Sequence, residues 1–358
     1  MVPTRRWRVL SVVLLPWVIA ACSSTKSGST STTTRAPSGG ADTTSPASTA
    51  AGTAGTAPAG AAASGTTRPK VLVAITTSGA VQALDPTTGR SLRTLATGAI
   101  GEEIGLSPDG LSVFYETPVG CTHQVNRVPT AGGARSVIAS GGHPTVSPDG
   151  TLLAYTRQPD FTASTSTSAC QAADTSAAAF SVVVRELATG RETNFPLPPA
   201  VVAGGLPLPI AHLSWAADNR RLAVSIGGGQ DNEQWSVSIM DRTQDKYYAN
   251  AASVPVSGPE RSYYREAAFL PSGDLFVDRE CCAGYPPQVT SSVLATVDAA
   301  TGATHQQVAI GVTTRDHASL DVDGTGHWLL YLSGPDLLIS NDGARPTTLA
   351  SGFQAAAW

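Results

Sequence analysis

The sequence predicts an all-β protein, a six-bladed β-propeller closed by its C-terminal strand, which follows a signal peptide and a disordered tether. A turn motif flanked by apolar runs recurs along the chain at a spacing of about 40 to 50 residues. Short strands at such a spacing are typical of propellers, in which each repeat forms one four-stranded blade. The last repeat stops after a single strand, which indicates how the ring closes.

The turn motif is Ser-Pro-Asp-Gly, found at residues 107–110 and 147–150. Proline presets φ for the first central position, aspartate bonds its own backbone, and glycine takes the corner with φ above zero. The runs that follow, residues 111–115 and 152–155, are short and rich in β-branched or aromatic residues. Each motif therefore predicts two strands joined by a tight turn.

Four further stretches carry the motif in degraded form, and an apolar anchor two residues before the proline position aligns all six. The anchors are Leu106, Val146, Trp215, Phe269, Leu320 and Trp358. The first three strands after Lys70 lack an inner partner, whereas residues 353–358 form an inner strand with nothing after it. We therefore expect the last strand to complete the first blade, which removes free sheet edges.

Residues 1–21 predict a lipoprotein signal peptide. Three arginines precede an apolar run at residues 9–21 that is too short to remain as a membrane span. The segment Ile-Ala-Ala-Cys at 19–22 resembles the lipobox of bacterial lipoproteins, which implies that Cys22 is diacylated and becomes the first mature residue. An ordinary signal peptide is the alternative, and the pair Arg5 and Arg6 leaves Sec or twin-arginine export open.

Residues 22–69 predict a lipidated cysteine followed by a disordered tether. Serine, threonine, alanine, glycine and proline make up almost all of this segment, and no aromatic residue occurs in it. Such a composition buries too little apolar area to offset the entropy of ordering. A flexible linker of this length spans about 35 to 40 Å. The expected result is a propeller at residues 70–358, lipid-anchored on the extracytoplasmic side of the cell membrane.

The charge of the chain argues against nucleic acid as a partner. Removing residues 1–21 takes away three of the 23 Lys and Arg and none of the 27 Asp and Glu, which leaves a formal charge of −7. No basic stripe interleaved with aromatic residues occurs in the domain.

The connections between the second and third strands of each repeat vary in length, with long ones at residues 158–179, 227–234 and 279–290. Such irregular loops on a rigid scaffold often carry function, although insertions are also simply tolerated there. Four cysteines fall in this loop class: Cys121, Cys170, Cys281 and Cys282. In an oxidising compartment we expect Cys121 to pair with Cys170, and Cys281 and Cys282 could form a vicinal bridge. Their spacing does not suit a metal site.

One set of polar residues recurs three positions before the anchors. The set is Glu103, His143, His212, Glu266 and His317, with Ala355 at the sixth position. The repeat geometry predicts that these residues surround the mouth of the central channel. Three imidazoles and two carboxylates could hold a divalent cation, or an anionic ligand when the histidines are protonated. A solvated polar ring that binds nothing is the alternative.

The anchor and its turn motif resemble the repeat of TolB-like, WD-repeat-like six-bladed propellers over residues 70–358. The resemblance implies a periplasmic or cell-surface scaffold that binds proteins. The chain contains no Gly-x-Ser-x-Gly nucleophile elbow, no His-Glu-x-x-His helix and no phosphate-binding loop. The first hypothesis is thus a monomeric scaffold of the cell envelope that binds a protein or a small ligand. The alternative is a lactonase-like hydrolase that uses a cation in the channel as a Lewis acid.

Overall fold

A computed structural model describes the chain from residue 67 onward. The described ranges are 67–157, 161–163, 170–172, 180–197, 210–227, 236–244, 248–249, 262–281, 291–307, 317–342 and 344–358. The predicted signal peptide, Cys22 and nearly all of the predicted tether lie outside them. Within these ranges every regular element is a β-strand, and no helix there is long and apolar enough to cross a membrane.

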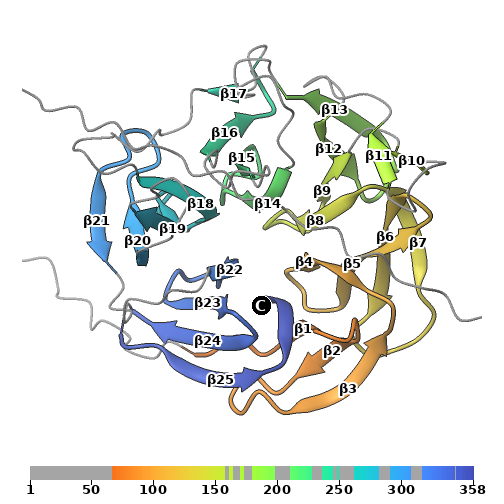
Figure 1. Cartoon of the computed structure of the whole chain (residues 1–358), viewed down its shortest axis with the longest axis horizontal. Coiled ribbons are helices and arrows are strands. Elements are labelled where there is room, and N and C mark those ends of the chain that lie inside the picture. The colour runs from red at the N-terminus through yellow and green to blue at the C-terminus, as the bar shows by residue number, and fades with distance from the viewer. Residues whose placement is uncertain are drawn as a thin grey trace, which may run out of the picture. The chain divides into compact units, whose positions relative to one another are not determined.

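Six four-stranded antiparallel sheets surround a common axis (Figure 1). We number these blades in chain order and give their strands from the axis outward. Blade 1 contains β26 (Phe353–Ala357), β1 (Leu72–Thr76), β2 (Val81–Leu84) and β3 (Ser91–Ala96). Blade 2 contains β4 (Ile100–Leu106), β5 (Ser112–Val119), β6 (Thr122–Pro129) and β7 (Ser136–Ser140). Blade 3 contains β8 (Gly142–Val146), β9 (Leu152–Arg157), β12 (Ser181–Glu186) and β13 (Glu192–Pro196).

The other three blades have the same construction. Blade 4 contains β14 (Ile210–Trp215), β15 (Arg221–Ile226), β16 (Ser236–Asp241) and β17 (Tyr248–Ala249). Blade 5 contains β18 (Ser262–Phe269), β19 (Leu275–Cys281), β20 (Ser291–Val297) and β21 (Thr304–Gln307). Blade 6 contains β22 (His317–Val322), β23 (Trp328–Ser333), β24 (Asp336–Asn341) and β25 (Thr347–Ser351). The predicted six-bladed propeller is confirmed.

The last strand closes the ring as the sequence predicted. Strand β26 pairs antiparallel with β1, and Ala356 lies opposite Ala74. One face of β26 packs Ala355 into a cluster with Tyr115 of blade 2. The other face packs Phe353 into a cluster with residues of blade 6. Closure therefore supplies main-chain hydrogen bonds to β1 and buries apolar side chains on both sides of the first blade.

The degraded turn motifs adopt the same geometry as the two full ones. In all five described turns the fourth residue donates its main-chain N–H to the carbonyl of the first, as Gly110 does to Ser107 at 2.7 Å. Asn219 stands where the full motif has glycine, with φ at 54° against 71° for Gly110. Asparagine is one of the few residues that tolerate this left-handed conformation. The alignment of the weaker repeats is confirmed.

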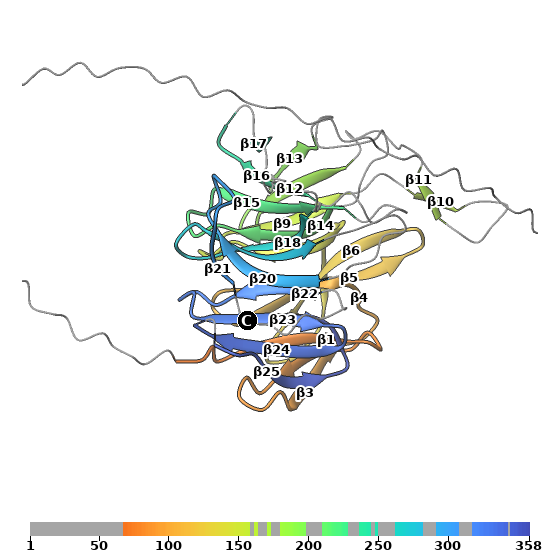
Figure 2. The same ribbon diagram turned by 60° about the vertical axis from the view of Figure 1, so that its left-hand side comes forward.

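The two sides of the ring differ. The five motif turns lie on one side, here called the turn side. The β5–β6 hairpin and the small hairpin of β10 (Phe161–Ala163) and β11 (Cys170–Ala172) project together on another side, called the loop side (Figure 2). Both belong to connections between the second and third strands of a blade. Because the two ends of a strand point to opposite sides of the ring, the loop side is opposite the turn side.

The chain enters the propeller on the turn side. Arg68, which the sequence placed in the tether, donates from Nη1 to the carbonyl oxygen of Pro86 at 2.9 Å. Its guanidinium carbon lies 4.5 Å from the ring centroid of Trp328. Pro86 belongs to the β2–β3 turn of blade 1, and Trp328 begins β23 just after the motif turn of blade 6. Contacts with the propeller thus begin two residues before the expected start at Lys70.

Candidate functional site

Irregular pairing of the innermost strands determines which side chains reach the channel. The register of β14 against β15 shifts between Ile210 and His212, and that of β18 against β19 shifts between Tyr264 and Glu266. The register of β4 against β5 and that of β8 against β9 also shift at the corresponding places in their blades. A bulge re-aims the side chain beside it. The positions three residues before the anchors are therefore places where regular alternation of side chains breaks down.

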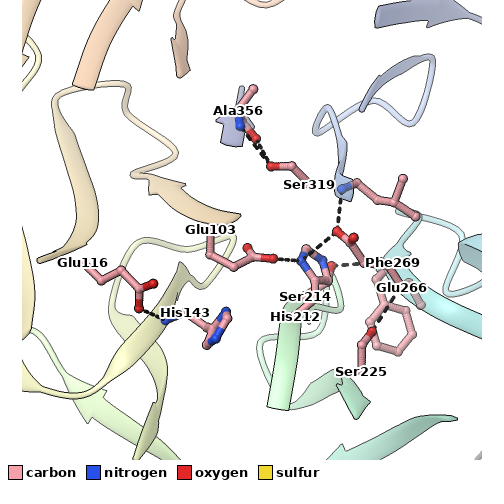
Figure 3. Close-up of polar contacts among 12 residues, drawn as sticks. Glu103, Glu116, His143, His212, Ser214, Ser225, Glu266, Phe269, Ser319 and Ala356 are labelled. Atoms are coloured by element: carbon pink, nitrogen blue, oxygen red, sulfur yellow. Dashed lines mark hydrogen bonds and ion pairs between the residues drawn. The ribbon is translucent and has the colours of Figure 1, made fainter. Parts of the chain in front are cut away.

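Three of the five predicted ring residues meet inside the channel. His212 lies between the carboxylates of Glu103 and Glu266 (Figure 3). Its Nδ1 forms an ion pair with Oε1 of Glu103 and lies 3.1 Å from Oε1 of Glu266. The side chains are only 7%, 7% and 9% exposed for His212, Glu103 and Glu266. This channel cluster joins blades 2, 4 and 5, and its burial differs from the alternative of a solvated polar ring at the channel mouth.

Burial changes the pKa of Glu266, one of the three members of the cluster. Glu266 accepts a hydrogen bond on Oε1 from the main-chain N–H of Leu320 at 2.7 Å, which ties the cluster to blade 6 (Figure 3). Burial raises the pKa of Glu266 to about 7; the imidazole of His212 opposes this increase and the carboxylate of Glu103 adds to it. A carboxyl group with such a pKa exchanges its proton near neutral pH.

A polar cavity of about 100 Å³ adjoins the cluster. Glu103 and His212 line it together with Thr145, Ser319 and Asp321. Burial raises the pKa of Asp321 to about 6, although the main-chain N–H groups of Trp358 and Val322 donate to its carboxylate. Pockets for drug-sized molecules measure about 300 to 1,000 Å³. The cavity is therefore suited to an ion with a few water molecules rather than to a large organic ligand.

The small residues directly before the anchors join neighbouring blades. Oγ of Ser214 accepts a hydrogen bond from the main-chain N–H of Phe269 at 2.9 Å (Figure 3). Oγ of Ser319 accepts from the N–H of Ala356 and donates to its carbonyl oxygen, at 2.9 and 3.0 Å. At Gly105 an added Cβ would lie 2.8 Å from the carbonyl oxygen of a blade 3 residue. These residues set the close spacing of the inner strands around the cluster.

The other positions of the predicted ring are not part of the channel cluster as the structure describes it. His143 adopts a positive φ of 49°, and its main-chain N–H donates to Oε2 of Glu116 at 3.2 Å. It belongs to no group of potential metal ligands found in the described part of the chain. His317 begins β22, but its side chain lies outside the described residues. Ala355 packs into the apolar core between blades 1 and 2.

The repeat pattern of the sequence did not point to a further buried acid, Glu116. Its side chain is only 2% exposed and lies 3.6 Å from Nδ1 of His123, where the carboxylate raises the pKa of that imidazole. It fits against two glycines: a Cβ added to Gly101 or Gly142 would overlap its carboxylate. The sequence did contain one sign of it: a glutamate directly follows the apolar run 111–115, within the same strand. Nothing in the turn motif pointed to it.

A second group of three possible ligands lies on the rim of blade 5. Asp274, Asp298 and His305 offer ligand atoms within 4.8 Å of one another, yet they are partly or fully exposed. Nε2 of His305 lies 3.7 Å from Oδ1 of Asp274. Oδ1 of Asp298 accepts hydrogen bonds from the main-chain N–H groups of Ala300 and Thr301 in its own turn. We call this group the rim cluster.

The cysteines have only partly described positions. Cys121 lies in the β5–β6 hairpin, and its thiol is not free. Cys170 belongs to β11 and Cys281 ends β19, but their side chains and the whole of Cys282 lie outside the described residues. The predicted pairings stay predictions.

Comparison with known proteins supports the fold. No protein-family model matches the sequence, and no curated protein matches it. Among solved structures, TolB from Acinetobacter baumannii is similar with a TM-score of 0.53 at 15% identity. The match covers 80% of this chain and 65% of that TolB, so less than two thirds of its length is matched. The putative TolB from Agrobacterium tumefaciens has a TM-score of 0.48 at 12% identity, with 80% and 92% covered. By fold, the described chain is a TolB-like six-bladed propeller.

Proposed function

We propose that the protein is a lipid-anchored, extracytoplasmic propeller that binds a protein or a small ligand of the cell envelope. The observation that carries this proposal is the order of parts along the chain. A lipobox-like segment ending at Cys22 is followed by a low-complexity segment and then by a closed six-bladed ring. Such an order fits a rigid recognition domain held at a distance from a membrane. The TolB-like fold agrees with a protein-binding role but does not identify a partner.

The loop side is the proposed binding face. The contacts of Arg68 with Pro86 and Trp328 place the entry of the chain on the turn side. The loop side lies opposite this point of entry. Long connections between second and third strands lie there, and irregular loops on a rigid scaffold are common recognition elements. We further propose that a disulfide between Cys121 and Cys170 joins the loops of blades 2 and 3 on this side.

Anchoring is tested by Cys22→Ala in the full-length chain. We expect the wild type in the detergent phase after phase separation and labelled by a radioactive fatty acid. The variant should lose the label and keep its uncleaved leader or appear in the soluble fraction. Replacement of another cysteine, Cys121→Ala, serves as the control and should keep the label. A Cys22→Ala variant with unchanged mass and labelling would show that the lipid is not attached there.

The binding face is tested with a photo-crosslinking amino acid at two exposed apolar positions. Val119, which is 45% exposed, lies on the loop side, and Leu111, which is 64% exposed, lies on the turn side. Crosslinking in intact cells should give a discrete adduct from position 119 and none from position 111. The reverse pattern would assign recognition to the turn side.

The alternative function, a lactonase-like hydrolase, depends on whether the central channel binds a cation.

A further inference from the structure

We propose that Glu103, His212 and Glu266 form a binding site for one divalent cation, of the zinc or manganese type, in the centre of the propeller. This inference goes beyond the envelope role proposed above and does not depend on it. One ligand atom from each residue lies within 4.8 Å of the other two. The three side chains come from different blades and are each less than 10% exposed. An ion bound there would join blades 2, 4 and 5.

The donor set agrees with such an ion. One imidazole nitrogen and two carboxylate oxygens suit zinc and manganese, whereas calcium prefers six to eight oxygens and copper favours more nitrogen or sulfur. Sites that bind zinc through three protein ligands leave a fourth position for water. The adjoining cavity of about 100 Å³, which Glu103 and His212 line, has room for that water.

One proton on the imidazole of His212 cannot serve both of the carboxylates that face it. Nδ1 of His212 carries at most one proton, so it can donate to Glu103 or to Glu266 but not to both. Both carboxylate oxygens nevertheless face this nitrogen. The other ring nitrogen, Nε2, is buried and has no hydrogen-bond partner among the described residues. A cation at Nδ1 would satisfy both carboxylates together and leave Nε2–H to donate to a water in the cavity.

The charge balance points the same way. Glu103 and Asp321 both line the cavity, and Glu266 adds a third carboxyl group beside it. The described lining contains no lysine or arginine. Buried carboxylates without a compensating charge are costly, so they are either protonated or paired with a cation. A doubly charged ion held by Glu103, Glu266 and a neutral His212 would neutralise its own ligands.

The rim cluster provides a matched control because it also combines one imidazole with two carboxyl groups, whose ligand atoms lie within the same 4.8 Å of one another. Its members are partly or fully exposed, and Asp298 already accepts hydrogen bonds within its own turn. Water screens such groups, so any ion there is expected to bind weakly. His212→Gln and His305→Gln each remove one imidazole from a three-residue group and keep a polar side chain.

The experiment titrates the full-length chain, freed of metal by dialysis against EDTA, with zinc and then manganese chloride in a calorimeter at neutral pH. We expect one ion per chain for the wild type and for His305→Gln. His212→Gln should weaken binding by about 100-fold or more, since even loss of an outer-shell partner costs about 10- to 100-fold. The isosteric variant Glu103→Gln should show a similar loss and is used if His212→Gln does not fold.

X-ray absorption of the zinc-loaded wild type gives a readout that needs no variant. Nitrogen and oxygen neighbours at about 2.0 to 2.2 Å are expected, and sulfur at about 2.3 Å would place the ion on cysteines instead. The proposal is overturned by that sulfur shell or by the absence of binding of either ion to the wild type. It is equally overturned by full binding in both channel variants, or by loss of binding in His305→Gln.

Discussion

The channel cluster and the rim cluster each combine one imidazole with two carboxyl groups, but they differ in burial and in the blades that supply their members. The channel cluster takes one residue from each of β4, β14 and β18, so it exists only when three blades are in place. The rim cluster takes all its members from blade 5, two of them beside turns and one from β21. One is a product of ring closure, and the other is a product of local hairpin geometry.

The difference in burial affects the pKa of a carboxyl group in each cluster. Burial raises the pKa of Glu266 in the channel cluster to about 7. On the rim, hydrogen bonds from the side chain and main chain of Thr301 lower the pKa of Asp298. Loss of water disfavours a carboxylate, and donated hydrogen bonds favour it. The buried Glu266 at the axis therefore holds its proton to a higher pH than Asp298 on the rim does.

The strongest test of the comparison removes the strand that closes the ring. Deletion of residues 353–358 should unpair β1 and open blade 1, which exposes the apolar clusters of Ala355 and Phe353. We expect loss of cooperative thermal unfolding, a change comparable with the whole net stability of a domain, about 5 to 15 kcal/mol. Gln354→Ala, at a half-buried position of the same strand, is the control and should unfold almost as the wild type does. A truncated chain with an unchanged melting temperature would contradict closure by β26.

A second test removes one carboxylate from each cluster. Glu266→Ala leaves the N–H of Leu320 buried without its acceptor and removes one of the two carboxylates that face the imidazole of His212. Removal of one partner from a buried ion pair costs about 3 to 5 kcal/mol, which urea denaturation would measure. Asp298→Ala removes an exposed turn acceptor and should cost clearly less. Equal losses for the two variants would mean that burial does not distinguish the clusters.

The smallest expected effect is a difference in pH dependence, measured on the metal-free protein. Burial raises the pKa of Asp321 from its ordinary 3.8 to about 6. The folded state then holds this proton more tightly than the unfolded state does. Protonated Asp321 therefore adds its full contribution to the free energy of unfolding below about pH 4, and this contribution is lost as the pH rises to about 6. In Asp321→Asn, the decrease in the free energy of unfolding between pH 4 and 6 should be smaller than in the wild type by on the order of 1 to 3 kcal/mol.

Asp298 on the rim has a pKa shift of the opposite sign, so its effect on the pH dependence of stability is also opposite. The pKa of Asp298 is lowered, so its contribution is present above the ordinary pKa of 3.8 and is lost as the pH falls below it. Asp298→Asn should therefore leave the slope between pH 4 and 6 as it is in the wild type. If Asp321→Asn keeps the wild-type slope in this range, another group is responsible for it.

The sequence by itself determined the repeat, the turns and the closure. These features depend on neighbouring residues: the Ser-Pro-Asp-Gly turn at 107–110 is specified by four adjacent side chains, and Asn219 can replace glycine because it tolerates the same φ. An inner strand left over at 353–358 then had only one unpaired edge to join, that of residues 72–76. Local chemistry and the counting of strands were sufficient for the fold.

Only the tertiary structure decided which polar residues meet. The repeat pattern treated Glu103, His143, His212, Glu266 and His317 as equivalent, yet only three of them come together in the described structure. Bulges in the inner strands turn equivalent positions in different directions, and His143 adopts a positive φ that no local pattern announced. Glu116 is held by glycines of two blades, which no repeat aligns. Contacts across the channel depend on the distances between blades, and a sequence read one blade at a time does not contain those distances.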